Sequence, residues 1–145
     1  MKDTTKLIIY TDGSAIDNNN TESDSKCGWA YKFIYDDGSE DTDCGSDVKK
    51  TNNQMEMTAV MNALRAVTNK AIPIELYSDS KYVIETLNGN YQIHKNQELW
   101  KELLEEKAKF ETISFFWVKG HDKNKHNKEV DAMAQEQAKN ASANE

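Results

Sequence analysis

The spacing of apolar residues changes after about residue 50. Before that point, short β-branched and aromatic runs alternate with polar stretches, which predicts strands at 6–11 and 28–35, a turn at 36–38 and a third strand to about 48. From 53 to 69 the apolar residues recur at helical spacing, and Thr51 and Gln54 have the spacing of a capping box. We then expect a strand from Pro73 to Ser78, a helix capped at 79–80 and running through Leu87, a helix at about 97–110, a strand at 112–118 and a last helix from 127.

This order of elements is β-β-β-α-β-α-α-β-α. Antiparallel strands followed by alternating strands and helices predict an α/β protein with a mixed sheet and helices packed on it. The 145 residues fit one domain, so we expect a single domain over 1–145, with a frayed tail at about 140–145.

Composition narrows the class of protein. No apolar run reaches the roughly 20 residues that span a bilayer, and the first residues lack the apolar core of a signal peptide, so we expect a cytoplasmic protein without a membrane partner. Two cysteines, Cys27 and Cys44, are too few for a disulfide framework, and whether they pair is left open. A net charge of −7 argues against a nucleic-acid partner, because proteins that bind polyanions usually carry basic surfaces.

Four acidic residues do not fit a solvated surface. Asp12 is expected to close an apolar strand, Asp79 to end another, Glu56 to lie beside the apolar stripe of the first helix and Asp131 to follow Val130 in the last. Singly, Asp79 has the alternative of an N-cap and Asp131 that of a favourable helix-dipole charge. Together, converging carboxylates would need a hard cation such as Mg²⁺ or Mn²⁺, and two such ions about 4 Å apart are the usual apparatus of phosphodiester cleavage. Sequence spacing alone does not bring the four together.

Four ordered segments carry these acids. They read Tyr-Thr-Asp-Gly-Ser at 10–14, Thr-Asn-Asn-Gln-Met-Glu at 51–56, Tyr-Ser-Asp-Ser-Lys-Tyr-Val at 77–83 and Trp-Val-Lys-Gly-His at 117–121, followed by Asp131. In residues, order and spacing, the chain from about 6 to 138 resembles ribonuclease H of type 1. The resemblance implies a five-stranded mixed sheet with helices on both faces. It also implies a sequence-nonspecific endonuclease that hydrolyses the RNA strand of RNA–DNA hybrids and leaves 5′-phosphate and 3′-hydroxyl ends.

The resemblance also assigns residues. Asp12, Glu56, Asp79 and Asp131 become catalytic ligands of Mg²⁺, or of Mn²⁺ as a substitute, with two ions when substrate is bound. His121 becomes a loop residue that assists proton transfer or product release, against the alternative of a solvated loop histidine. The implied substrate contacts are Gly13, Ser14, Asn18, Thr51, Asn52, Asn53, Gln54, Ser80 and Asn127.

Several of these contacts have a chemical rationale and an alternative. Asn52 and Asn53 can donate and accept, which suits the 2′-hydroxyls and base edges of a minor groove. Thr51 matches a residue that holds a DNA-strand phosphate, and its hydroxyl can equally cap the helix. Asn18 matches another member of that phosphate pocket through a loop of different length, and Asn127 has the alternative of an N-cap.

The chain departs from many type 1 relatives by lacking a basic protrusion. Residues 81–110 contain five lysines and five glutamates, so this region supplies no net positive charge. We therefore expect weak, strongly salt-sensitive hybrid binding, by a monomer that needs no protein partner.

Three other functions remain open at this stage. Another nuclease of the same fold, such as a junction resolvase or exonuclease, would cut substrates without RNA. A binding module that has lost catalysis would hold hybrids without cutting them, and a piece of a retroelement polyprotein would carry the activity within a longer chain.

Overall fold

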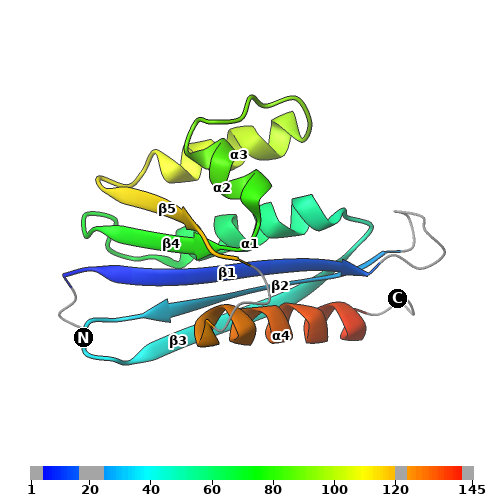
Figure 1. Cartoon of the computed structure of the whole chain (residues 1–145), viewed down its shortest axis with the longest axis horizontal. Helices are drawn as coiled ribbons and strands as arrows, with labels where there is room; N and C mark the ends of the chain where they lie inside the picture. The colour runs from blue at the N-terminus through cyan, green and yellow to red at the C-terminus, as the bar shows by residue number, and fades with distance from the viewer. Residues whose placement is uncertain (1–4, 17–24, 120–123, 142–145) are drawn as a thin grey trace.

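The computed structural model describes residues 5–16, 25–119 and 124–141, and the elements follow the expected order (Figure 1). The strands are β1 Leu7–Ile16, β2 Lys26–Ile34, β3 Glu40–Val48, β4 Ile74–Ser78 and β5 Ile113–Trp117. The helices are α1 Asn52–Ala66, α2 Lys81–Leu87, α3 Gln97–Lys107 and α4 Lys125–Asn140.

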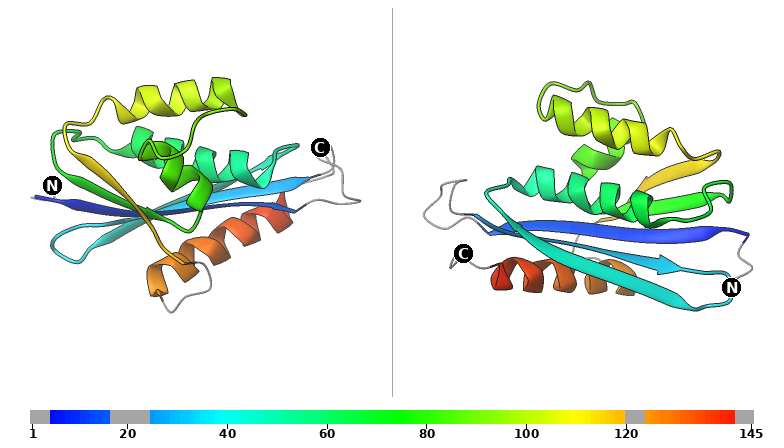
Figure 2. Two further views of the ribbon diagram at one scale, coloured as in Figure 1. Left: turned by 45° about the horizontal axis from the view of Figure 1, so that its top comes forward. Right: turned by 180° about the vertical axis from the view of Figure 1, so that it is seen from behind.

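The five strands form one mixed sheet in the order β3-β2-β1-β4-β5. β1 is antiparallel to β2 and parallel to β4, and β4 is parallel to β5. Helices α1 and α2 lie on one face of this sheet, with α3 packed against α1 on the same side, and α4 crosses the other face over β1, β2 and β3 (Figures 1 and 2). The predicted α/β class, the mixed five-stranded sheet and the helices on both faces are confirmed.

Two predicted boundaries were wrong in ways that affect the site. β1 continues to Ile16 because β2 pairs with it along its length, so Asp12 lies inside the strand opposite Ala30 rather than closing it. α4 begins at Lys125, and the side chain of Asn124 caps it by accepting from the backbone N–H of Asn127. The N-cap alternative for Asn127 is therefore wrong. Elsewhere, α1 ends at 66 rather than 69 and α3 at 107 rather than 110, because the chain turns there to enter β4 and β5.

The start of α1 follows the sequence prediction. The hydroxyl of Thr51 accepts from the Gln54 backbone N–H at 3.1 Å, and the Gln54 side chain accepts from the Thr51 backbone N–H at 2.9 Å. Both bonds satisfy N–H groups that a helix start otherwise leaves without partners. The direction of α1, and with it the position of Glu56 one turn later, is therefore fixed locally.

Two hydrophobic layers hold the sheet. The larger layer packs α1, α2 and α3 on one face through residues such as Ile9, Leu64 and Trp100, and the smaller packs Val130 and Ala134 of α4 on the other. The smaller layer also contains a buried charge, the ammonium of Lys32, which lies 2.9 Å from a Glu129 carboxylate oxygen and 3.1 Å from one of Glu40. Such a charge is tolerated in a protein interior because it is paired. No pattern in the sequence had indicated this buried lysine.

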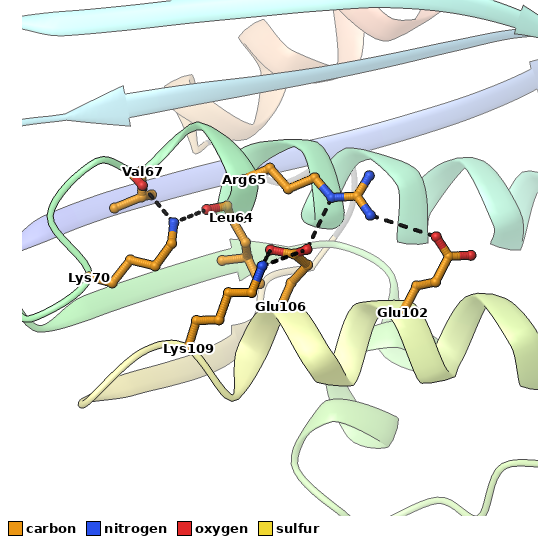
Figure 3. Close-up of polar contacts among 7 residues, drawn as sticks. All are labelled: Leu64, Arg65, Val67, Lys70, Glu102, Glu106 and Lys109. Atoms are coloured by element: carbon orange, nitrogen blue, oxygen red, sulfur yellow. Dashed lines mark hydrogen bonds and ion pairs between the residues drawn. The ribbon is translucent and has the colours of Figure 1, made fainter.

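Ion pairs join α1 to α3 on the far side of the first layer (Figure 3). Arg65 of α1 lies 3.2 Å from Glu106 and 3.6 Å from Glu102 of α3. After α1 ends, the ammonium of Lys70 donates to the backbone oxygens of Leu64 at 3.1 Å and Val67 at 2.6 Å, which satisfies carbonyls at the helix end.

The cysteines and the helices also answer two questions left by the sequence. Cys27 and Cys44 are both free thiols, on neighbouring strands.

Among the helices of the described ranges, none has the length and apolar character needed to cross a bilayer.

Candidate active site

Carboxylates from four separate elements meet at one cavity. Asp12 comes from β1, Glu56 from α1, Asp79 from the residue after β4 and Asp131 from α4. One oxygen each from Asp12, Glu56 and Asp79 lies within 4.8 Å of the others. The cavity measures about 230 Å³, and its remaining walls are formed by Gly13, Ser14, Asn52 and Gln135.

Gly13 allows α1 to lie directly against β1. A Cβ atom at this position would be 2.2 Å from the backbone carbonyl carbon of Met55, so any side chain would push the helix away. The backbone N–H of Gly13 donates to the Glu56 carboxylate at 2.9 Å. The close approach therefore also fixes the orientation of Glu56 beside Asp12.

Asp79 is held by the elements on both sides of it. Ser80, rather than Asp79, caps α2, because its hydroxyl accepts from the Val83 backbone N–H at 3.2 Å. The N-cap alternative for Asp79 is therefore wrong. From β5, the indole N–H of Trp117 donates to the backbone oxygen of Asp79 at 3.1 Å.

Asp131 joins the cluster from the opposite face of the sheet. It lies on α4, half-buried, and forms a side-chain hydrogen bond with Asp12. Gln135, one turn further along the same helix, donates from its side-chain nitrogen to both Asp131 oxygens at 3.1 and 3.2 Å. The helix-dipole reading of Asp131 does not explain these contacts. The fourth carboxylate is therefore oriented by a residue of its own helix and faces the other three.

Burial and mutual repulsion raise the pKa of the two innermost acids. Burial raises the pKa of Asp12 most, and the charge of Glu56 adds to it. Burial also raises the pKa of Glu56, with a further contribution from the charge of Asp79. Crowded, desolvated carboxylates of this kind are stabilised by a bound cation, and their oxygens are the hard ligands that Mg²⁺ and Mn²⁺ prefer. The donor set fits a divalent metal site.

The predicted substrate contacts fall into three groups. Ser14 and Asn52 line the cavity, and the Asn52 side chain accepts from the Ala15 backbone N–H at 3.1 Å. Asn53 is exposed at the start of α1, beside the capping pair of Thr51 and Gln54.

Ser80 caps α2, and Asn127 is buried near the start of α4. The oxygen of the Asn127 side chain is buried without a hydrogen-bond partner among the described residues. Asn18 and His121 lie outside the described residues.

Sequence reasoning missed three residues of this region. Gln135 lies four residues after Asp131, a spacing that places both on one helix face and could have identified it. Asn96 has a left-handed backbone with φ of 60° and accepts from the Gln54 side chain at 3.2 Å, a contact across 42 positions that no local pattern encodes. The bond from Trp117 to Asp79 depends likewise on strand order.

Comparison with known proteins agrees with this geometry. The family model described as RNase H matches residues 4–139. The chain belongs to the ribonuclease H family. Ribonuclease H of Ehrlichia chaffeensis is 37% identical over 91% of this chain and 94% of the relative. Ribonuclease H of Wolbachia pipientis is 37% identical over 89% of this chain and 92% of the relative.

Solved structures of ribonucleases H share the fold. The N-terminal RNase H domain of a Mycobacterium tuberculosis protein superimposes with a TM-score of 0.80 at 22% identity, over 95% of this chain and 96% of that domain chain. LC11-RNase H1, solved in complex with an RNA/DNA hybrid, has a TM-score of 0.77 at 19% identity, over 93% of this chain and 98% of its own. The chain is thus a ribonuclease H of the bacterial type 1 class.

Proposed function

We propose that this ribonuclease H hydrolyses the RNA strand of RNA–DNA hybrids as a sequence-nonspecific endonuclease, at a two-metal site built by Asp12, Glu56, Asp79 and Asp131. The observation that carries the proposal is the convergence of four carboxylates, from four elements, at one cavity of a ribonuclease H fold. When bound, the metal ions supply activation of the attacking water and stabilisation of the leaving oxygen. Mg²⁺ is the proposed ion and Mn²⁺ its substitute.

The protein's own contribution is to place its charged oxygens before the substrate arrives. Glu56 is held by the Gly13 backbone N–H, and Asp131 by Gln135. Water attacks phosphorus in line, the bond from phosphorus to the 3′-oxygen breaks, and that oxygen leaves as a 3′-hydroxyl, so the new RNA end carries a 5′-phosphate. Electrostatic preorganisation of this kind usually supplies the largest part of an enzyme's rate enhancement. His121 is proposed to assist the proton transfer or the release of product.

Selection of a hybrid requires groups that sense 2′-hydroxyls and helix shape. Asn52 lines the carboxylate cavity and Asn53 follows it at the start of α1; both are exposed, and their amide groups suit contacts in the minor groove. We propose that Thr51, with Asn18, holds a phosphate of the DNA strand, and that Gly13, Ser14, Gln54, Ser80 and Asn127 also contact the substrate. Asn96, bonded to Gln54, extends this surface.

The experiment compares substrates and metals. Labelled RNA–DNA hybrid, double-stranded DNA and double-stranded RNA are incubated with Mg²⁺, Mn²⁺ or EDTA, and the products are sized and their ends tested with a phosphatase. We expect cutting of the hybrid alone, only with metal, leaving 5′-phosphates. Cutting of double-stranded DNA would instead support a resolvase or exonuclease, and an uncut hybrid in both metals would support a binding module.

Two variants test the roles within the site. Asp12→Asn removes a charged ligand with little change in volume, so cleavage should fall to background, while the matched exposed change Glu105→Gln on α3 should retain it. His121→Ala should slow turnover and leave measurable activity, because water can still take up or supply the proton, but more slowly than a positioned imidazole. Equal and complete loss in the Asp12 and His121 variants would contradict the subsidiary role of the histidine.

Further properties follow from the same proposal. The region from α2 to α3 carries no excess of basic residues, so hybrid affinity should be weak and fall steeply with salt. An affinity equal to that of a relative with a basic protrusion, measured at the same salt, would contradict this. We also propose that the 145 residues act as one catalytic domain, as a cytoplasmic monomer. Sedimentation of the active protein and fractionation of cells test these last points.

A further inference from the structure

A second cleft lies at the other end of α1 from the carboxylate site. It measures about 620 Å³, within the range of small-ligand and side-chain pockets. Val67 and Ile72 form one wall, just after α1 ends, and Leu7 of β1 lies beneath them. Glu56 and Ala66 are ten positions apart on the helix, so the two sites are separated by about 15 Å along its axis.

Aromatic rings of β2 form the floor of this cleft. Tyr31 and Phe33 alternate along β2, and Tyr35 follows the last residue of the strand in the same alternation, so the three rings line the cleft together. The rings of Tyr31 and Phe33 stack with centroids 5.0 Å apart, and Tyr35 meets Phe33 edge-on at 6.4 Å. The floor is therefore aromatic rather than aliphatic. Tyr31 and Phe33 are 8% and 4% exposed, so the half-buried Tyr35 offers the most accessible ring.

Carboxylates of β3 form the second wall. Asp43 pairs across the sheet with Tyr31, and Asp41 with Phe33, so both acids share the face of the rings, and both are exposed. The Tyr35 hydroxyl donates to Asp41 at 2.8 Å, and the Tyr31 hydroxyl is bonded to Asp43. Burial, and then this bond to Asp41, raise the pKa of Tyr35 to about 12, so the phenol keeps its proton and remains the donor in this bond.

The described lining of the cleft contains two acids and no lysine or arginine. Negative charge beside aromatic faces is the environment that attracts organic cations, and a guanidinium suits it best because it is planar, stacks on rings and pairs with carboxylates in a fixed geometry. We propose that this aromatic–acidic cleft binds an arginine side chain from a basic segment of a partner protein. The partner is a different protein, because the chain's single arginine, Arg65, is paired with Glu102 and Glu106 on α3.

The test measures binding of a short fluorescent peptide in which arginines alternate with glycine and serine. The protein is kept in saturating Mg²⁺, so that the carboxylate site does not attract the peptide. The double variant Asp41→Asn with Asp43→Asn should weaken binding about tenfold, the size expected for losing two charged partners. The matched pair Glu98→Gln with Glu105→Gln, on exposed positions of α3, makes the same change in net charge and should alter binding less than about twofold.

A third variant separates the shape of the cleft from its charge. Thr68→Trp places a large ring at an exposed lining position without altering any charge, and should weaken binding about as much as the double aspartate variant. Cleavage of the hybrid in every variant shows that the fold is retained.

Other outcomes would overturn the proposal. The two double variants could weaken binding equally, or Thr68→Trp could leave binding unchanged. The same peptide with glutamate in place of arginine could bind more tightly. Spermidine at matched charge could displace the arginine peptide. The last would identify the occupant as a free polyamine.

Discussion

The metal-free carboxylate cluster should make the protein less stable than it would be with one acid fewer. Asp12 lies beside Glu56 and Asp79, with oxygens no more than 4.8 Å apart. We predict that Asp12→Asn, which should abolish cleavage, raises the free energy of unfolding when no divalent metal is present. Functional sites commonly hold such unfavourable arrangements, which are relieved only when the ligand binds.

The size of the effect follows from the distance. Two unit charges 4.8 Å apart, at an effective dielectric constant of about 20, repel each other by about 3.5 kcal/mol. The folded cluster avoids part of this by keeping a proton, since burial raises the pKa of both Asp12 and Glu56. We therefore expect a gain of about 1–2 kcal/mol, which corresponds to a rise in Tm of about 3–6 °C for a domain of this size.

The assay is thermal unfolding in EDTA and in Mg²⁺, with Glu105→Gln as the control that removes one exposed negative charge. In EDTA the Asp12 variant should unfold at a higher temperature than the native protein, and the control should not. In Mg²⁺ the order should reverse, because metal binding stabilises the folded native protein by mass action and the variant has lost a ligand.

Two results would refute this reasoning. A lower Tm of Asp12→Asn in EDTA would show that the carboxylate is stabilising without metal, as a partner in a proton-sharing network. An equal rise in Tm with Mg²⁺ for the native protein and the variant would show that Asp12 is not a ligand.

The remaining predictions concern pH, the helix contact and the tryptophan. The folded pKa of Glu56, about 8, lies above its ordinary value, so the folded state binds more protons than the unfolded chain. The free energy of unfolding without metal should therefore fall as pH rises from about 4.5 to about 8. Urea unfolding in EDTA across that pH range measures this free energy, and an increase with pH would contradict the prediction. Gly13→Ala should lose more than about 3 kcal/mol in urea unfolding, while Ser14→Ala should lose little, because only the former drives a Cβ into α1. Trp117→Phe removes the N–H that donates to Asp79, and should lower kcat about fivefold while the KM for hybrid stays unchanged. Phe116→Leu changes a similarly exposed residue on the other face of β5 and should leave kcat unchanged. A rise in KM with unchanged kcat in Trp117→Phe would instead make the ring a substrate contact.

Much of the architecture could be predicted because local patterns determined it. The change from alternating to helical spacing located the elements, and the capping box at Thr51 and Gln54 marked the start of α1 correctly. The boundaries that were wrong depend on partners distant in sequence. Nothing near Asp12 shows that β2 continues to pair with β1 as far as Ile16.

The candidate site shows the same division. Each of the four carboxylates could be identified as unusual from its sequence neighbours, and the motifs indicated that the four act together. No spacing rule, however, brings residues 12 and 131 into contact. Long-range contacts such as Gln54 with Asn96, or Lys32 with Glu129, arise from strand order and helix placement. They could not be read from a single sequence.

The arrangement of α4 has a consequence for synthesis of the protein in the cell. Asp131 lies on the last helix, and α4 packs across β1, β2 and β3, the first strands to be made. A chain still emerging from the ribosome therefore lacks both the fourth carboxylate and the layer that covers one face of its sheet. Nascent or terminated chains that lack α4 should be unable to cleave, so nuclease activity begins only after α4 has been made.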